Sequence, residues 1–292
     1  MSYADTLQRF LFEGSAVRGE LVHLDRTWTT MLDGRDYPEP VRAILGEFTA
    51  AIALLASTIK FEGSLILQIQ GDGPVSLLVV ECDSHGVMRG MAKWGQLPAE
   101  GGLRQLVGDG KLVITIDPKG GRERYQGIVE LQGETVADVL MAYMQRSEQL
   151  PTHLWLAANQ QQASGLLLQR MPEDGSEYAD EDWNRTNLLA ETVTREELLE
   201  LAPQQLIHRL YHEEDVRLFE PRPLRFGCSC SRDRVIRTLR ILGYQDLQQL
   251  LQERGKVSVD CEFCNQHYEF DAVDVEQIFA AASTRQASPT RH

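Results

Sequence analysis

The chain has 292 residues, of which 42% are hydrophobic and 25% charged, and its formal net charge at pH 7 is -14. This composition is typical of a globular protein and excludes fibrous and low-complexity classes, while the length favours two domains or one domain with an appendage. The acidic excess repels a phosphate backbone, so we expect no nucleic-acid partner for the chain as a whole.

No targeting or membrane segment is predicted. Residues 1–12 lack a basic stretch followed by an apolar run, and no segment approaches about 18 consecutive apolar residues. We therefore expect a cytoplasmic protein without a membrane partner. Because the cytoplasm keeps thiols reduced, paired cysteines there are more typical of a metal or redox site than of structural disulfides.

Residues 1–172 are predicted to form an α+β domain with a mainly antiparallel sheet and packed helices. One buried helix covers 38–58 and begins at Pro38, and an amphipathic helix covers 135–146. Most links between strands are short and turn-like, as at Gly71-Asp72-Gly73-Pro74, which favours antiparallel pairing. The predicted strands are 17–24, 64–70, 75–81, 86–94, 111–117, 124–131, 153–157 and 165–171.

This first domain contains no motif that indicates catalysis. GxGxxG, GxxxxGK(S/T), GxSxG and HExxH are all missing, and no pair of carboxylates stands out. We therefore predict that the protein is not an enzyme. Cys82 stands alone in a predicted strand and is interpreted as a small buried hydrophobic residue.

Residues 173–221 are predicted to form an acidic, amphipathic and metastable linker. They carry 14 Asp and Glu against 4 Lys and Arg, interspersed with leucines. Thr194 and Glu197 form a capping box that begins one helix, and Pro203 begins a second. Such short helices need a surface to pack against, because helix nucleation is costly.

Four of the five cysteines predict a metal site near the C-terminus. They form a CxC pair and a CxxC pair within a module predicted at 222–277, ahead of a flexible tail at 278–292. Two closely spaced pairs of cysteines can supply the four ligands of a tetrahedral zinc ion. One Zn²⁺ per chain would stabilise so small a module by about 10 to 16 kcal/mol. The predicted zinc ligands are Cys228, Cys230, Cys261 and Cys264.

Three histidines were considered as further ligands. His267 follows Cys264 by three residues and could replace one thiolate, although four cysteines make this unnecessary. His208 and His212 have the spacing of two ligands on one helix face. No third ligand accompanies them, so a solvated helix face is the preferred interpretation.

The cysteine spacing alone leaves two other functions open. A zinc ribbon that binds nucleic acid is the alternative, because a basic run opposed only by Asp233 lies beside the CxC pair. A thioredoxin-like use of Cys261 and Cys264 is disfavoured, since no βαβ pattern surrounds them. The basic run consists of Arg222, Arg225, Arg232, Arg234, Arg237 and Arg240.

Several segments together resemble the 33 kDa chaperonin family of redox-regulated heat-shock chaperones. The cysteine pairs follow an acidic linker that ends in Leu210-Tyr211-His212-Glu213-Glu214. Further similar segments, in the same order, are Ala16-Val17-Arg18-Gly19-Glu20-Leu21-Val22, Gln70-Gly71-Asp72-Gly73-Pro74, Glu123-Arg124-Tyr125-Gln126-Gly127 and Arg146-Ser147-Glu148-Gln149-Leu150-Pro151. The resemblance covers essentially the whole chain.

The resemblance implies an ATP-independent holdase that protects thermally unfolding and oxidatively damaged proteins from aggregation. It implies that the reduced, zinc-bound form is inactive. Oxidation would then release zinc and form two redox-active disulfides, Cys228 with Cys230 and Cys261 with Cys264. The partners implied are unfolded client proteins and, on activation, a second copy of the chain.

Energetics support such a switch if those two disulfides form. Closing loops of three or four residues stabilises by only about 1.5 to 2 kcal/mol each, whereas the lost metal costs about 10 kcal/mol or more. The module should therefore unfold on oxidation. We further hypothesise that residues 173–221 pack over the first domain in the reduced state and hide a client surface there.

Overall fold

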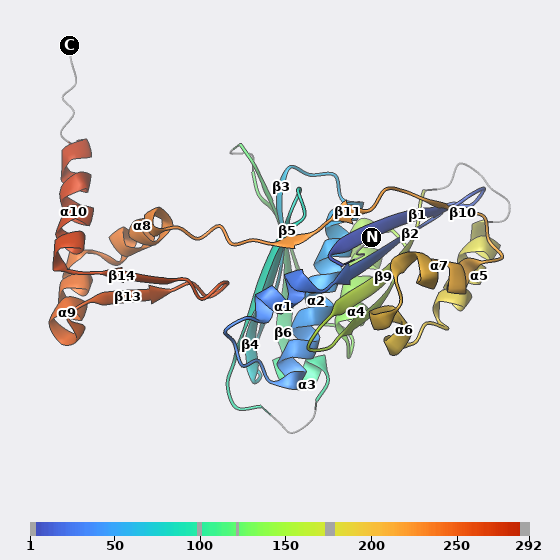
Figure 1. The fold of residues 1–292 in the computed structure, drawn as a ribbon, viewed down its shortest axis with the longest axis horizontal. Coiled ribbons are helices and arrows are strands. Elements are labelled where there is room, and N and C mark those ends of the chain that lie inside the picture. Colours follow the sequence, from blue (N-terminus) through green and yellow to red (C-terminus); the bar gives the residue numbers. More distant parts are fainter. Residues whose placement is uncertain (1–3, 98–100, 121–122, 173–178, 287–292) are drawn as a thin grey trace, which may run out of the picture. The chain divides into compact units, whose positions relative to one another are not determined.

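The computed structural model describes residues 4–97, 101–120, 123–172 and 179–286 (Figure 1). The chain divides into two compact units, Met1–Gly227 and Cys228–His292. The mixed α+β class with a C-terminal cysteine module is confirmed. The predicted four-part division at 172, 221 and 277 stays a prediction, and residues 173–178, where the predicted linker begins, lie outside the described part of the chain.

The first unit is built on two sheets. The strands are β1 (Thr6–Phe12), β2 (Val17–Leu24), β3 (Gly63–Gly71), β4 (Val75–Asp83), β5 (Val87–Trp94), β6 (Gly110–Pro118), β7 (Tyr125–Glu130), β8 (Thr152–Ala158), β9 (Ala163–Arg170), β10 (Val216–Leu218), β11 (Arg222–Pro223) and β12 (Arg225–Phe226). Sheet A has the order β10-β1-β2-β9-β8, with β11 also paired to β1. Sheet B has the order β12-β5-β4-β3-β6-β7. Only the β12–β5 pair is parallel, so the predicted antiparallel character is confirmed for the described strands.

Helix α2 (Glu39–Thr58) lies between the two sheets and contacts β8 and β9 on one side and β4 on the other (Figure 1). The predicted helix is confirmed, with Pro38 as its N-cap. Because both sides are covered, the helix is apolar around most of its circumference and is the one helix in the described residues long and apolar enough to cross a membrane. Most of that stretch, 67%, is buried within the protein, so α2 is its core helix.

The remaining helices of the first unit pack around the two sheets and α2. They are α1 (Arg26–Leu32), α3 (Leu103–Val107), α4 (Val136–Tyr143) with a π-helical continuation at Met144–Glu148, α5 (Ala179–Ala190), α6 (Arg195–Glu200) and α7 (Pro203–Tyr211). Helix α6 contacts β8 and β9, α7 contacts β2, and α5 contacts α7 (Figure 1). The predicted linker helices are thus present as α6 and α7, and Thr194 caps α6 as predicted.

Apolar contacts hold the linker helices on sheet A. Leu198, Leu206 and Leu210 are buried in one cluster with Phe10 and Phe12 of β1. The Tyr211 ring meets the Phe12 ring edge-on with centroids 4.8 Å apart. The linker is therefore a layer of the first unit's fold, supported by a surface as its short helices require.

The eight predicted strands are confirmed with ends within two residues. The sequence did not predict four longer elements of the first unit, β1, α1, α3 and α5. It also did not predict the short strands β10 to β12. Strand β1 is buried on both faces, with Leu7 in the main core and Phe10 and Phe12 against the linker helices, and its neighbours in space come from residues 17–24 and 216–223.

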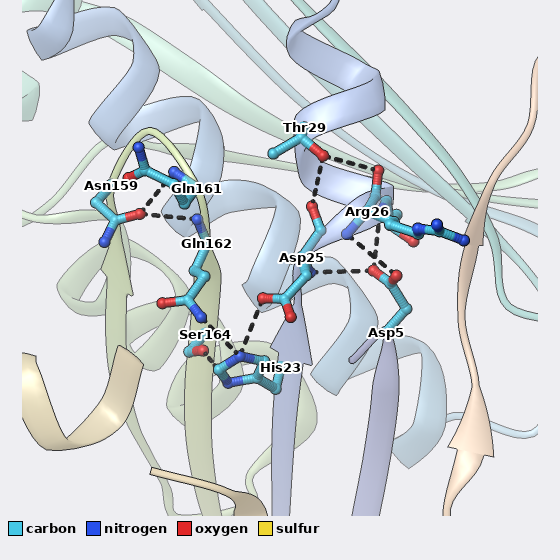
Figure 2. A network of polar contacts seen from close by, with 10 residues as sticks. Asp5, His23, Asp25, Arg26, Thr29, Asn159, Gln161, Gln162 and Ser164 are labelled. Atoms are coloured by element: carbon cyan, nitrogen blue, oxygen red, sulfur yellow. Dashed lines mark hydrogen bonds and ion pairs between the residues drawn. The ribbon is translucent and has the colours of Figure 1, made fainter. Parts of the chain in front are cut away.

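A polar network fixes the corner between β2 and α1 (Figure 2). The carboxylate of Asp5 accepts hydrogen bonds from the backbone N–H groups of Asp25, Arg26 and Thr27, at 3.1, 3.1 and 2.8 Å, and so caps the helix N-terminus. The buried His23 ring lies 3.1 Å from both the Ser164 hydroxyl and the Asp25 carboxylate. These bonds tie the N-terminus of the chain to sheet A and α1.

The second unit is a small α+β module. It contains α8 (Arg232–Leu242), α9 (Tyr244–Arg254), the antiparallel hairpin β13 (Val257–Asp260) and β14 (His267–Phe270), and α10 (Ala272–Gln286). Among the residues that the structure describes, its core consists of seven buried hydrophobic residues, Leu239, Leu247, Leu251, Val257, Phe270, Val275 and Ile278. A core of this size gives limited stability without a further constraint.

Candidate metal centre

The two cysteine pairs lie in two connecting segments of the second unit, one before α8 and one between β13 and β14. Cys261 and Cys264 occupy the turn between β13 and β14, where the Cys261 N–H donates to the Gln266 carbonyl at 3.0 Å and the Asn265 N–H donates to the Cys261 carbonyl at 2.8 Å. Asn265 has a φ of 56°, a left-handed conformation that asparagine tolerates better than most residues. Cys228 and Cys230 precede α8.

The start of α8 keeps the CxC pair in place. Ser231 is the N-cap of the helix, and its hydroxyl accepts a hydrogen bond from the Arg234 N–H at 3.3 Å. The Arg234 guanidinium also donates to the Ser229 hydroxyl, between the two cysteines. The helix cap and the first cysteine pair are therefore one local structure.

The four sulfur atoms converge in the way that the sequence spacing predicts. All four Sγ atoms lie within 4.8 Å of one another. The Cys228 and Cys261 sulfurs are 3.6 Å apart, and the Cys230 and Cys264 sulfurs are 3.4 Å apart. A tetrahedral zinc ion with Zn–S bonds of about 2.3 Å places its sulfurs about 3.8 Å apart, so this donor set fits zinc.

The electrostatics of the cluster favour a cation. All four cysteines are thiols that contact one another and are partly buried. Burial raises the pKa of the Cys264 thiol, so a thiolate at this position needs a compensating positive charge. The Tyr268 hydroxyl donates to the Cys230 sulfur at 3.2 Å, and this hydrogen bond raises the pKa of Tyr268 to about 12.

Tyr268 is a site residue that the sequence analysis missed. It lies on β14, four residues beyond Cys264, and its ring also packs against the small core of the module. A hydroxyl that donates to a ligand sulfur is a common outer-shell feature of thiolate metal sites. An aromatic residue shortly after a CxxC pair was the only signal available.

The three histidines that were possible further ligands lie outside the cysteine cluster. His267 Nδ1 lies 2.6 Å from the Asp260 carboxylate and Nε2 lies 3.0 Å from Glu269, so both ring nitrogens already have acidic partners. The rings of His208 and His212 meet edge-on, with centroids 6.0 Å apart. In the part of the chain that the structure describes, the four cysteines are the group suited to hold a metal ion.

The basic run is divided between the two units. Arg222 and Arg225 belong to β11 and β12 of the first unit, whereas the other four arginines lie on α8. Arg232 binds the Asp274 carboxylate at 2.8 Å and lies over the Phe270 ring at 4.2 Å. Arg240 donates to the Ile278 carbonyl at 3.1 Å. Arg232 and Arg240 thus join α8 to α10 and to the hairpin.

The acidic residues of the linker find arginine partners inside the first unit. Arg185 binds both Asp182 and Glu214, with N to O distances of 2.9 and 2.8 Å. Arg209 binds Glu197 at 2.7 Å. These pairs connect α5 to the end of α7 and α6 to α7, so they stabilise the linker's own arrangement.

Comparisons with known proteins agree with these findings. The family model described as Hsp33 protein matches residues 5–271. The chain is 51% identical over 298 aligned positions to the 33 kDa chaperonin of Azotobacter vinelandii and 49% identical over 298 positions to that of Pseudomonas aeruginosa, with 100% of both chains covered in each case.

A solved structure shares the fold. The crystal structure of the 33 kDa chaperonin from Thermotoga maritima has a TM-score of 0.82, with 20% identity, over 96% of this chain and 99% of that chain. The full-length sequence identity to curated relatives and the match to the family model lead to one assignment: the chain belongs to the Hsp33 family.

Proposed function

We propose that the protein is a redox-regulated chaperone of the holdase type, and that the four cysteines are its switch. The convergence of four sulfurs within 4.8 Å in a module with a small core is the observation that carries this proposal. Its relatives bear the name 33 kDa chaperonin. Unfolded proteins are the proposed partners, and a cytoplasmic location keeps the thiols reduced at rest.

In the resting state, Cys228, Cys230, Cys261 and Cys264 would hold one zinc ion. Bound zinc would compensate the four thiolates and add folding free energy of about 10 to 16 kcal/mol to the module. Such a contribution exceeds the stability expected of seven buried hydrophobic residues in so small a unit. The fold of the module and the state of its sulfurs are thus coupled.

Oxidation would convert the ligands into disulfides. In each disulfide, two thiols lose two electrons and two protons to an oxidant such as peroxide, which is reduced to water. We propose the local pairs Cys228 with Cys230 and Cys261 with Cys264. The shortest sulfur contacts in the structure join the opposite pairs, Cys228 to Cys261 and Cys230 to Cys264, so disulfide mapping distinguishes the two outcomes.

The two pairings have opposite physical consequences. Disulfides between the CxC pair and the CxxC pair would close loops of about thirty residues and keep the two pairs together. Disulfides within each pair leave the two pairs free to separate. Only the local pairing therefore removes the constraint on the module. The linker helices, which are marginal alone, would then lose order and uncover the outer face of sheet A.

The decisive experiment follows zinc release and suppression of client aggregation in the same samples as peroxide is titrated. We expect the two curves to coincide, and we expect the zinc release of a Cys82→Ala variant to match that of the parent because Cys82 lies outside the cluster. If suppression of aggregation depends neither on the peroxide concentration nor on zinc release, the proposed switch is refuted.

The same samples test the alternatives. Salt-sensitive binding of nucleic acid by the reduced, metal-loaded form would support the zinc-ribbon alternative. Catalytic turnover with a dithiol substrate would support an oxidoreductase. Sedimentation of the oxidised protein tests the proposed homodimer, which should be present only after activation.

A further inference from the structure

The last residues of the first unit, 215–227, form an extended segment that we call the strap. Its strands β10 and β11 extend sheet A along the outer edge of β1, and its strand β12 extends sheet B along the edge of β5. One continuous segment therefore covers an edge of each sheet. Cys228, the first of the four cysteines, follows the strap directly in the sequence.

Main-chain hydrogen bonds attach the strap along its whole length. On sheet A, the Glu13 N–H donates to the Asp215 carbonyl at 2.9 Å and the Phe219 N–H donates to the Arg9 carbonyl at 3.0 Å. The Leu224 N–H donates to the carbonyl of Asp5, the residue that caps α1 in Figure 2, at 2.8 Å. On sheet B, the N–H groups of Arg225 and Gly227 donate to Gly86 and Met88 at 3.0 and 2.9 Å.

Leu224 is the one strap side chain that is buried, at 8% exposure. It packs into the main core beside Leu7, Ala53 and Cys82, and about 20 Å³ of space remains in that pocket. Other strap side chains are exposed, including Leu218 at 41%, or only partly buried. Arg217 pairs with Glu13 at the surface.

This mode of attachment places few demands on sequence. Main-chain bonds to a sheet edge accept any extended polypeptide, and one pocket takes a buried apolar residue, while Val216 and Phe226 make partly buried apolar contacts. The strap thus occupies a site that suits a segment of an unfolded protein. A chaperone that must capture many clients needs such tolerance.

We propose that the edges of β1 and β5 and the Leu224 pocket, once the strap leaves, bind an extended segment of an unfolded client in the place of the strap. The proposal rests on the proposed function, because oxidation must first release the strap. It assigns the client site to sheet edges in the first unit, and it makes the strap an internal competitor of the client.

Cys82 provides a direct reporter for this site. It lies in the pocket of Leu224 and is 2% exposed. Burial raises the pKa of its thiol to about 12, so it is unreactive while the strap is in place. After oxidation it is the only cysteine outside the two proposed disulfides.

The test uses the full-length protein, a maleimide and two synthetic peptides. One peptide has the sequence of residues 215–227, and its matched control carries Leu224→Asp. Alkylation of Cys82, located by mass spectrometry after digestion, should rise at least about tenfold when the protein is oxidised. The parent peptide and a bound client should each protect Cys82, and the parent peptide should compete with client capture about ten- to a hundredfold better than the control.

The outcomes separate this proposal from the function on which it rests. If oxidised protein suppresses aggregation while Cys82 stays protected throughout, or if captured client leaves Cys82 fully reactive, the client binds elsewhere and only this proposal fails. If Cys82 of the oxidised protein becomes protected from alkylation as the protein concentration rises, with no client present, a second copy of the chain occupies the vacated edges. That result would overturn the client assignment. If oxidised protein captures no client, the proposed function fails as well.

Discussion

At the scale of single residues, Glu20 is a buried acidic group of the first unit. It lies on β2 with 1% exposure, and neither carboxylate oxygen has a hydrogen-bond partner among the described residues. The Arg9 guanidinium is 3.9 Å away, and Arg18 and Arg222 add favourable charge. Burial outweighs these arginines and raises the pKa of Glu20 to about 7.

The raised pKa predicts how stability depends on pH. The folded state binds the proton more tightly than the unfolded state, so this contribution to stability is complete below about pH 4.5 and is lost as the pH rises through about 7. Glu20→Gln should therefore stabilise the first unit by up to about 3 kcal/mol at pH 8 and have little effect at pH 4.

Urea unfolding followed by tryptophan fluorescence measures this effect, because Trp28, Trp94, Trp155 and Trp183 all belong to the first unit. Glu130→Gln, at an exposed position of β7, is the matched control and should leave the pH profile unchanged. A Glu20→Gln profile parallel to that of the parent protein would show that Glu20 stays charged.

The sequence predicts some of the residues discussed above and not others. The cysteines are recognisable because ligand spacing is local, whereas the hydrogen bond of Tyr268 to Cys230 depends on how the hairpin turns back toward the CxC pair. Glu20 reads as an ordinary strand residue. Its burial arises from helix α2 and from strands that are distant in the sequence.

At the scale of elements, the linker helices are predicted correctly from local sequence signals, although their stability depends on packing against sheet A. The capping box and Pro203 predict α6 and α7 because both signals lie within a few residues. Strand β1 and the strap were not predicted. The strap strands β10 and β11 are two or three residues long and pair with β1, about two hundred positions away in the sequence. Edge strands of this kind carry weak sequence patterns.

The linker should open more easily when its apolar contacts are weakened. Leu206 on α7 is fully buried at 0% exposure, so Leu206→Ala should destabilise linker packing by about 2 to 5 kcal/mol. We expect such a variant to suppress aggregation at a lower temperature or peroxide concentration than the parent.

Leu188→Ala on α5 is the matched control, because this leucine is 64% exposed. It should leave the activation threshold unchanged. Equal thresholds for the two leucine variants would mean that detachment of α7 from sheet A does not limit activation.

At the scale of the whole molecule, the two units have different sources of stability. The first has a core that spans two sheets and α2, whereas the second has seven buried hydrophobic residues and the four cysteines. The length of the chain predicts two domains or one domain with an appendage. The limit of the first unit at Gly227 was not foreseen, because β11 pairs with β1 and β12 pairs with β5, both far away in the sequence.

Metal removal should therefore affect the units unequally. Chelation of the reduced protein should abolish amide-exchange protection in α8 and the β13–β14 hairpin, since the module loses most of its folding free energy with the metal. Strands β2, β3 and β9 should keep their protection and act as the internal control. Persistent protection of the hairpin without metal would show that the small core is sufficient.

The pairing of β2 with β9 has a consequence for synthesis. Val17 to Leu24 pair with Arg170 to Ala163, and α2, with twelve buried residues, is covered from both sides only when β4, β8 and β9 are present. Chains emerge from the ribosome from the N-terminus, so an apolar helix leaves it long before most of its covering strands. A protein proposed to shield others from aggregation thus passes, during its own translation, through a state that needs shielding.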